Sequence, residues 1–380
     1  MLTSAPTASG LDDVVVASTA LSDVDGARGE LIIRGYTVEA LAERARFEDV
    51  CALLWNGAWP TSSDTRDIRE ELAQTRQEAF AMLPTLGDAL AAPDAMESLR
   101  AAVSHLRSAG DVLDRARLTG AIAVFAAAWE RQRAHQDPVP PRPDLSHAAD
   151  MLRMLSGIEA EPASVAALDA YWCSVVDHGM NASTFTARIV TSTGSDAISA
   201  VAAALGALKG PLHGGAPGPV LDMLDAIGDT SRARPWLERE LAVGRRIMGM
   251  GHRMYRVRDP RAAALERAIR ALEASGVSAR RLPLARVVER EAEHLLAERH
   301  PNRPLRANVE FYTAVLLDAV HVPRSLFTAM FAASRVAGWC AHIDEQRAVG
   351  RLIRPASVYV GAPAVLLTSD ESADTRRSVG

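Results

Sequence analysis

The sequence predicts a mainly α-helical protein with two domains. Apolar residues recur at helical spacing along most of the chain, and segments typical of strands are few. Strands do not alternate with helices in the way that builds a parallel sheet, so neither a Rossmann fold nor a TIM barrel is expected. With 380 residues, the chain is long enough for a large hydrophobic core and a second domain.

Two strands and a helix are expected near the N-terminus. The segments "VVVAS" (14–18) and "ELIIRG" (30–35) are rich in β-branched residues and flank the turn dipeptide Asp25–Gly26. The next segment, "RFEDVCALLWNGAWP", has apolar residues at the i, i+3, i+4, i+7 spacing of a helix face, and Gly57 provides a stop signal.

Helical periodicity continues toward the C-terminus. It predicts further helices near residues 63–81, 97–108, 111–134, 146–156, 163–177, 196–208, 235–247, 260–274, 284–299 and 324–348. The proline-rich stretch 136–144 is expected to be a loop, and "SVYVG" (357–361) a short strand. The tail after Gly361 is expected to be poorly ordered.

Composition and charge exclude several classes of partner. The net charge of −5 does not favour nucleic-acid binding, and the longest apolar runs, such as 197–208, are too short to cross a membrane. The three cysteines have no metal-binding spacing and suit a reducing compartment. The N-terminal segment lacks the features of a secretory signal. We therefore expect a cytoplasmic protein without a metal, nucleic-acid or membrane partner.

Two glycine-rich segments contain candidate histidines. In "GPLHGGAPGP" (210–219), glycines around His213 would let the backbone approach a ligand closely, although a plain turn with an exposed histidine fits equally well. In "MGMGHRMYRVRDPRA", His252 follows Gly249 and Gly251. This lone G-x-G is not a dinucleotide fingerprint, because it follows no strand and lacks the third glycine.

A helix start lies just after His252. Asp259 as N-cap and Pro260 at the first helical position place Arg261 in the first turn. A cation there opposes the helix dipole, which a bound anion would explain. A solvated arginine beside Asp259 is the alternative. The nearby Arg256 adds positive charge suited to phosphates or carboxylates.

Three other segments carry polar residues that need an explanation. The segment "DHGMNASTFTARIVTSTGSD" (177–196) includes His178 in a polar patch, which a helix end with capping residues also explains. Arg335 lies on an apolar helix, so it needs an anionic partner, either a protein carboxylate or a ligand. In "ANVEFYTAVL", Asn308 is a plausible N-cap, and Glu310 is either an ordinary helix-end acid or a base kept out of water.

Taken together, these segments resemble the citrate synthase family. The similarity covers nearly the whole chain and preserves the family's order of motifs: "DHGMNASTFTARIVTST", "GALKGPLHGGA", "IMGMGHRMYRVRDPRA", "NVEFYTAVLL", "ASRVAGWCAH" and "IRPASVYVG". The resemblance implies a homodimer of two-domain helical subunits. A large domain (1–213 plus 323–380) would carry the dimer contacts and the oxaloacetate site, and a smaller inserted helical domain (214–322) the coenzyme A side and the catalytic acid.

The resemblance also implies a reaction and a set of site residues. The family condenses an acyl-CoA, usually acetyl-CoA, with oxaloacetate and hydrolyses the thioester, without a metal or bound cofactor. His213 would hold the thioester carbonyl, His252 would polarise the oxaloacetate ketone, and Glu310 would remove the methyl proton. The other implied contacts are to oxaloacetate from His178, His252, Arg261 and Arg335, with Arg354 of "IRP" reaching across from the partner subunit, and to coenzyme A from Arg256.

Two positions depart from the family pattern. Glu310 stands where the family usually has aspartate, and Pro217 where asparagine is common. Since a shift of about 1 Å can cost about 10²-fold in a proton transfer, the extra methylene of Glu310 must be accommodated in the site. Three hypotheses follow: a citrate synthase, which we favour, a 2-methylcitrate synthase using propionyl-CoA, and a non-catalytic paralogue that binds acyl-CoA or oxaloacetate.

Overall fold

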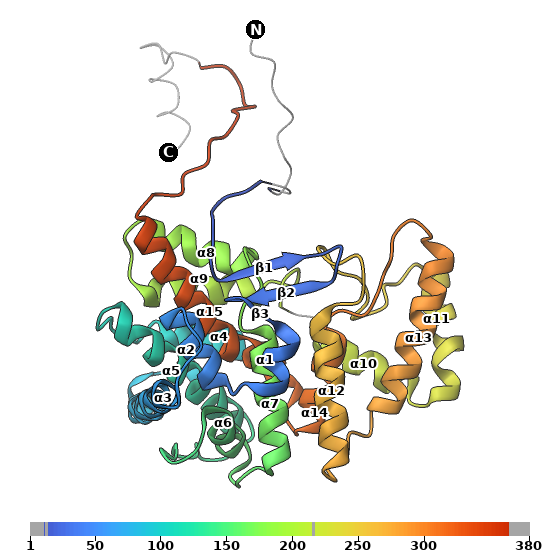
Figure 1. Cartoon of the computed structure of the whole chain (residues 1–380), viewed down its shortest axis with the longest axis horizontal. Helices are drawn as coiled ribbons and strands as arrows, with labels where there is room; N and C mark the ends of the chain where they lie inside the picture. The colour runs from blue at the N-terminus through green and yellow to red at the C-terminus, as the bar shows by residue number, and fades with distance from the viewer. Residues whose placement is uncertain (1–10, 12–13, 215–216, 365–380) are drawn as a thin grey trace, which may run out of the picture.

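The computed structural model describes residues 11, 14–214 and 217–364. It shows a mainly helical molecule with one small sheet, which confirms the predicted fold class (Figure 1). Gly215 of the glycine-rich turn around His213 and the tail from residue 365 lie outside the described residues.

The helices agree with the predicted periodicity over most of the chain. Their bounds are α1 (Val38–Arg44), α2 (Phe47–Asn56), α3 (Ser62–Met82), α4 (Ala95–Val103), α5 (Asp111–Arg133), α6 (His147–Ser156), α7 (Pro162–Val175), α8 (Ala182–Ser192), α9 (Ala197–Lys209), α10 (Pro217–Ile227), α11 (Ala233–Ala242), α12 (Pro260–Ala274), α13 (Leu282–Arg299), α14 (Val309–Ala319) and α15 (Phe327–Val349).

The sheet is a small antiparallel unit at one edge of the molecule (Figure 1). Its strands β1 (Ser22–Asp25), β2 (Glu30–Ile33) and β3 (Tyr36–Thr37) pair in the order β1-β2-β3, with Asp23 opposite Ile32. The predicted strand at 30–35 and the turn before it are therefore confirmed.

The predicted strands at 14–18 and 357–361 are wrong. Both segments have irregular backbone, and Val15 and Val360 are 87% and 92% exposed. β-branched residues fit a pleated surface, but a strand also needs a neighbouring backbone to pair with. Within the described residues of this subunit, neither segment has such a neighbour.

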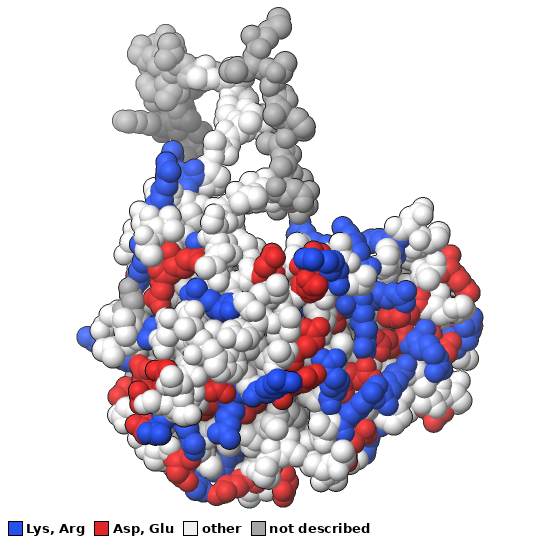
Figure 2. Space-filling view, in the orientation of Figure 1, with Lys and Arg blue, Asp and Glu red and all other residues white. Residues whose placement is uncertain are grey.

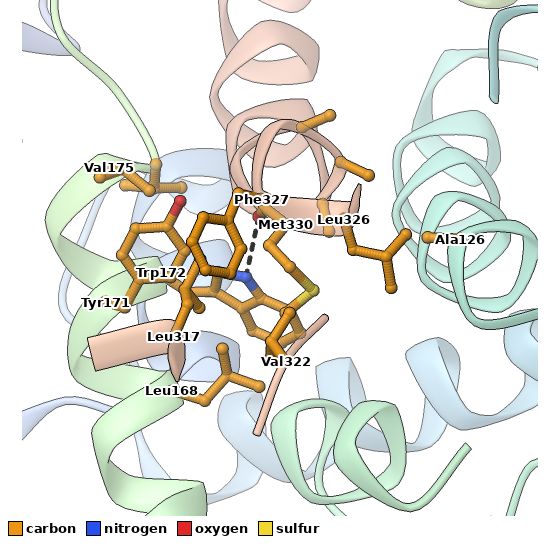
Figure 3. Close-up of a cluster of buried hydrophobic side chains, with 14 of the residues drawn as sticks. Ala126, Leu168, Tyr171, Trp172, Val175, Leu317, Val322, Leu326, Phe327 and Met330 are labelled. Carbon is orange, nitrogen blue, oxygen red and sulfur yellow. Dashed lines mark hydrogen bonds between the residues drawn. The ribbon is translucent and has the colours of Figure 1, made fainter. Parts of the chain in front are cut away.

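Helix α15 runs through the core of the molecule. It packs against α5, α7, α8 and α9, and most of its length is buried. This burial explains why its apolar residues surround the whole helix instead of forming one stripe. Trp172 and Trp339 are among the largest fully buried side chains, and the Trp172 indole donates a hydrogen bond to the Met330 carbonyl at 3.1 Å (Figure 3).

The helices from α10 to α14 occupy one side of the molecule (Figure 1). There α11 packs on α13, while α12 and α14 pack on each other and on α7. The contacts of α12 and α14 with α7 bring this part of the chain against the α15 core. These helices fall in the range 214–322, whose division from the rest as a separate domain stays a prediction.

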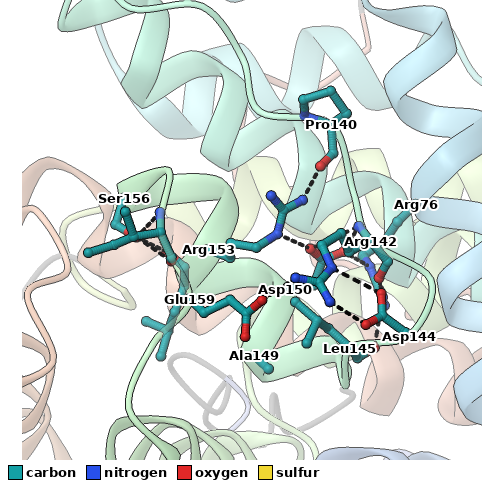
Figure 4. Close-up of polar contacts among 12 residues, drawn as sticks. Arg76, Pro140, Arg142, Asp144, Leu145, Ala149, Asp150, Arg153, Ser156 and Glu159 are labelled. Carbon is teal, nitrogen blue, oxygen red and sulfur yellow. Dashed lines mark hydrogen bonds and ion pairs between the residues drawn. The ribbon is translucent and has the colours of Figure 1, made fainter.

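The predicted loop at 136–144 is confirmed and is held down by arginines. Arg76, fully buried, pairs with Asp150 at 2.8 Å and also donates to backbone carbonyls of the loop region. Arg142 of the loop donates its backbone N–H to Asp150, and the Arg153 guanidinium donates to the Pro140 carbonyl (Figure 4). These contacts explain how a loop rich in proline keeps one conformation.

Three predictions about partners are not decided by the fold. Within the described ranges, no helix has the length and apolar character needed to cross a membrane. In the same residues, no group of three or more histidine, cysteine, aspartate or glutamate side chains is placed to hold a metal ion. The cytoplasmic location and the absence of a cofactor or nucleic-acid partner stay predictions.

Candidate active site

Two glycines hold the His252 loop against the start of α14. The backbone N–H of Asn308 donates to the Gly249 carbonyl, and its side-chain amide donates to the Gly251 carbonyl, both at 2.9 Å. Gly249 has φ +73°, and a Cβ there would lie 2.9 Å from the Phe311 side chain. Only glycine fits this approach, which brings His252 close to the first turn of α14.

His252 is held as a neutral hydrogen-bond donor. Its Nδ1 accepts the backbone N–H groups of Met254 at 3.0 Å and Tyr255 at 3.2 Å. Burial, and then the charge of Arg261, lowers the pKa of His252 to about 4. A neutral ring whose Nδ1 is an acceptor carries its proton on Nε2, so this atom is left to donate.

Arg261 is buried and paired with a carboxylate, so the solvated alternative is wrong. It is 3% exposed, and its Nε and Nη2 donate to Asp259 at 3.0 and 2.8 Å. Asp259 also caps α12 as predicted and accepts the Val309 N–H at 3.1 Å. Arg261 Nη2 lies 3.4 Å from His252 Nε2. Because both atoms carry protons, an acceptor oxygen placed between them would satisfy both.

His178 joins the same cluster from the segment between α7 and α8. Its Nε2 lies 3.1 Å from the Tyr255 hydroxyl, and its ring centroid lies 5.4 Å from that of His252. Burial, followed by the charge of Arg261, holds the pKa of His178 well below its usual value. Sequence reasoning missed Tyr255, whose position three residues after His252 was the available signal.

His213 lies in the turn between α9 and α10. Its Nε2 accepts the Ser183 backbone N–H at 3.2 Å, and the Ser183 hydroxyl lies 2.8 Å away. Nδ1 therefore carries the proton of the neutral ring. Burial, and then Arg335, lowers the pKa of His213 to about 4. The alternative of a plain turn with an exposed histidine is therefore wrong.

The polar patch before α8 caps that helix and also contacts His213. Asn181 caps the helix by accepting the Thr184 N–H at 3.1 Å. Ser183 Oγ lies 2.9 Å from Asn181 Oδ1 and accepts the Trp339 indole N–H at 3.2 Å. Ser183, to which sequence reasoning gave no role, thus links the helix cap to His213.

Arg335 is a buried cation without a carboxylate partner. It is 1% exposed; its Nε donates to the Val175 carbonyl at 2.7 Å, and its guanidinium lies 4.5 Å from the Phe331 ring centroid. Across the described ranges, no carboxylate lies within ion-pair distance of it. Burial lowers the pKa of Arg335 to about 10. Such a charge creates a strong preference for an anion in the adjoining space.

Glu310 is the acid of this cluster. Asn308 caps α14 as predicted, accepting the Glu310 backbone N–H at 3.0 Å. Within the residues described, no group donates a hydrogen bond to the Glu310 carboxylate. Burial raises the pKa of Glu310 to about 7; Arg261 opposes the rise and Asp259 adds to it. The residue is thus a first-turn acid and also a carboxylate suited to take up a proton near neutral pH.

Known proteins similar to this chain indicate its family. Residues 10–356 match the family model described as citrate synthase, C-terminal domain. This chain belongs to the citrate synthase family. It is 39% identical over 369 residues to the "Putative citrate synthase 2" of Mycobacterium tuberculosis, covering 93% of this chain and 92% of the relative. It is 36% identical over 360 residues to a "2-methylcitrate synthase" of the same species, with 93% and 90% covered.

A solved structure agrees over nearly the whole length. The citrate synthase of Thermoplasma acidophilum, solved in a ternary complex with carboxymethyl coenzyme A and oxaloacetate, superimposes with a TM-score of 0.83. The match covers 95% of this chain and 98% of that one, at 28% identity. The predicted citrate synthase-like fold is therefore confirmed, and the protein is an enzyme of the acyltransferase class.

Two residues that the family resemblance singles out lie outside the cluster in this subunit. Arg256 is exposed, and its backbone N–H donates to the Gly26 carbonyl at 2.8 Å. Arg354 is exposed on the segment after α15, which leads away from the body of the molecule (Figure 1). The contacts predicted for them, from Arg256 to coenzyme A and from Arg354 to the partner subunit's site, stay predictions.

A basic cavity of about 790 Å³ opens beside His252. Figure 2 shows basic side chains gathered over the part of the molecule that carries α12 and α13. The cavity combines an apolar lining with cationic groups, which suits a ligand with both apolar and phosphate parts. The arginines that line it are Arg245, Arg246, Arg253, Arg299 and Arg303, and His300 lies among them.

Proposed function

We propose that this protein is a citrate synthase, which condenses acetyl-CoA with oxaloacetate and water to give citrate and coenzyme A. The observation that carries the proposal is the buried cluster around Glu310. A carboxylate with a pKa of about 7 lies among buried arginines and histidines that are neutral donors. Proton abstraction next to a thioester carbonyl needs such a base and such donors.

In the first step, Glu310 takes a proton from the acetyl methyl group. The electron pair of that C–H bond moves toward the thioester oxygen, where His213 donates a hydrogen bond from Nδ1. A neutral imidazole can stabilise this oxygen without competing for the proton, because its pKa of about 4 keeps it uncharged at pH 7. The product of the step is an enol or enolate with a nucleophilic carbon.

In the second step, that carbon attacks the oxaloacetate ketone and a carbon–carbon bond forms. The ketone oxygen becomes an alkoxide, which would face both donors, His252 Nε2 and Arg261 Nη2. The proton that Glu310 took up in the first step balances the proton that this oxygen finally gains. Arg335 and Arg261 would bind the two substrate carboxylates, with His178 alongside. Water then cleaves the thioester and releases coenzyme A.

The predicted domains would divide the site between them. His178 and Arg335 belong to the range 1–213 plus 323–380, while His252, Arg261 and Glu310 belong to 214–322. Closure of the smaller domain on the larger one would bring Glu310 close to the oxaloacetate-binding arginines and exclude water from the enol. The basic cavity beside His252, together with Arg256, would accept the phosphates of coenzyme A.

A homodimer would complete each site with Arg354 of the other subunit. The exposed position of Arg354 beyond α15 supports this part of the proposal. Mixed dimers test it, because an Arg354→Ala subunit and an Arg335→Leu subunit would together form one intact site. At an oxaloacetate concentration well below the raised KM of each variant, random mixing of the two weakened variants is expected to restore about one quarter of the wild-type activity. Activity that stays at the level of the separate variants would contradict a shared site.

Release of free thiol tests the function directly. With oxaloacetate present, we expect coenzyme A release from acetyl-CoA with a higher kcat/KM than from propionyl-CoA. A preference for propionyl-CoA would instead identify a 2-methylcitrate synthase, in which the pocket around Glu310 holds one more methyl group. Oxaloacetate binding without thiol release from either thioester would identify a non-catalytic paralogue.

A further inference from the structure

The hydroxyl group of Tyr171 is buried without a hydrogen-bond partner. Tyr171 is 0% exposed, and among the described residues neither its Oη nor the Oγ1 of Thr313 has a partner within hydrogen-bond distance, although the Thr313 hydroxyl is near enough to act on the phenol. Most buried polar groups in folded proteins are paired, so an unpaired one requires an explanation. Aromatic residues at helical spacing are usually core residues, which is why sequence reasoning passed over Tyr171.

Tyr171 lies on α7 and points toward the end of that helix that adjoins the site. Figure 3 shows its ring beside Trp172 and Leu317, with the hydroxyl turned toward Val175. The Val175 carbonyl accepts the Arg335 Nε–H at 2.7 Å. The ring is therefore anchored in the apolar core, while its polar end faces the buried cation.

The hydroxyl also faces the helix that carries Glu310. Helices α7 and α14 are in contact, and Thr313 lies three residues after Glu310, on the same face of α14. The charged groups that act on Tyr171 come from three helices: Arg335 from α15, Glu310 from α14 and Arg261 from α12. The two arginines have only donors, so Glu310 is the one group of the three that can accept the Tyr171 proton.

We propose that the Tyr171 hydroxyl positions the Glu310 carboxylate in the substrate-bound enzyme by donating a hydrogen bond to it, with Thr313 steadying the phenol oxygen. This inference rests on the proposed function of Glu310. It also explains how a glutamate works where the family usually has aspartate. The longer side chain has one more torsion, and a rigid donor behind it restricts the carboxylate to one position.

Tyr171→Phe tests the proposal because it removes the hydroxyl and keeps the ring. A donor to the ionised carboxylate favours the charged form, so its loss makes the base harder to ionise. The acid limb of the pH profile, where kcat/KM rises with pH, is expected to move upward by about one pH unit. The kcat at pH 7 is expected to fall about tenfold. The KM for oxaloacetate should stay unchanged, and Tm should not fall, since the hydroxyl has no partner in the free protein.

Tyr312→Phe is the matched control. Tyr312 also lies on α14, but its hydroxyl donates to Glu289 at 2.5 Å, away from the cluster. This variant is expected to have a lower Tm and an unchanged acid limb in the pH profile of kcat/KM, which is the reverse of the Tyr171→Phe result. An unmoved acid limb in Tyr171→Phe, or a change in the oxaloacetate KM alone, would overturn the proposal.

Infrared titration of the Glu310 carboxyl separates this inference from the proposed function. Spectra of the oxaloacetate-bound protein, with those of Glu310→Gln subtracted, report the ionisation of this group without turnover. A higher titration midpoint in Tyr171→Phe than in wild type supports the hydrogen bond even if no thiol is released. Equal midpoints overturn the inference even in an active citrate synthase.

Discussion

Replacing Glu310 by glutamine is expected to lower kcat about 10²–10⁴-fold, the usual contribution of a general base. Glutamine keeps the size of the side chain but cannot take up the methyl proton. Oxaloacetate should still bind, since Arg261 and Arg335 remain. The measurements are thiol release and calorimetric titration with oxaloacetate. Glu310→Asp is the control, because it keeps the carboxylate and shortens its reach; full activity of the glutamine variant would rule out the assigned base.

The same substitution has an effect on stability whose sign follows from the pKa of Glu310. The folded-state pKa of about 7 lies above the ordinary value of 4.5, so the folded protein binds the proton more tightly. The stability that this provides is complete below pH 4.5 and is lost as pH rises through 7. Relative to wild type, the glutamine variant should therefore gain stability above pH 7, by about 3 kcal/mol at most. Denaturant unfolding at pH 5 and pH 8 measures the difference.

Wild-type activity should show the corresponding pH dependence. The base must be ionised to act, so kcat/KM is expected to rise with pH through about 7. The histidines do not contribute to this limb, because the pKa values of His213 and His252 are lowered to about 4. A limb that stays in place in Glu310→Asp but disappears in Glu310→Gln would assign it to this carboxylate.

Local sequence signals predicted the helix starts of the site correctly. Asp259 and Asn308 cap α12 and α14 as their patterns indicated. The same side chains have second partners that no local pattern contains: Asp259 pairs with Arg261 and accepts the Val309 N–H, and Asn308 holds the Gly251 carbonyl. Caps depend on neighbours within a few residues, whereas these additional contacts depend on how distant helices pack.

The periodicity of the sequence could not predict that the histidines of the site lie close together. His178 and His252 are far apart in sequence, yet their rings touch; only the family resemblance placed them together in advance. Helix α10 was missed as a whole because the proline and glycine at its start are typical of a loop, and α8 was missed because its first turn is polar. Ser183 was assigned only to a polar patch, and Tyr255 was missed, because their partners are histidines from other segments.

Replacing Arg335 by leucine is expected to raise the KM for oxaloacetate about 30-fold or more, as loss of one partner of a buried charge pair does in other complexes. Among the described residues, the guanidinium contacts the Val175 carbonyl and the Phe331 ring, and the charge of Asp177 acts on it from beyond ion-pair distance. Removing a buried cation without a carboxylate partner relieves a desolvation cost, so the free energy of unfolding should stay the same or rise. Steady-state kinetics and denaturant unfolding measure the two effects.

Arg76→Leu provides the matched comparison for this result. Arg76 is also fully buried, but it pairs with Asp150 at 2.8 Å, far in sequence from the site residues. Breaking that pair leaves the buried Asp150 carboxylate with Arg153, at 3.3 Å, as its remaining cation. The loss should still cost up to about 3–5 kcal/mol of stability, with no change in the KM of the folded fraction. If Arg335→Leu lost stability in the same way and bound oxaloacetate normally, Arg335 would be a structural residue. The opposite pattern would show that its charge is kept for the substrate.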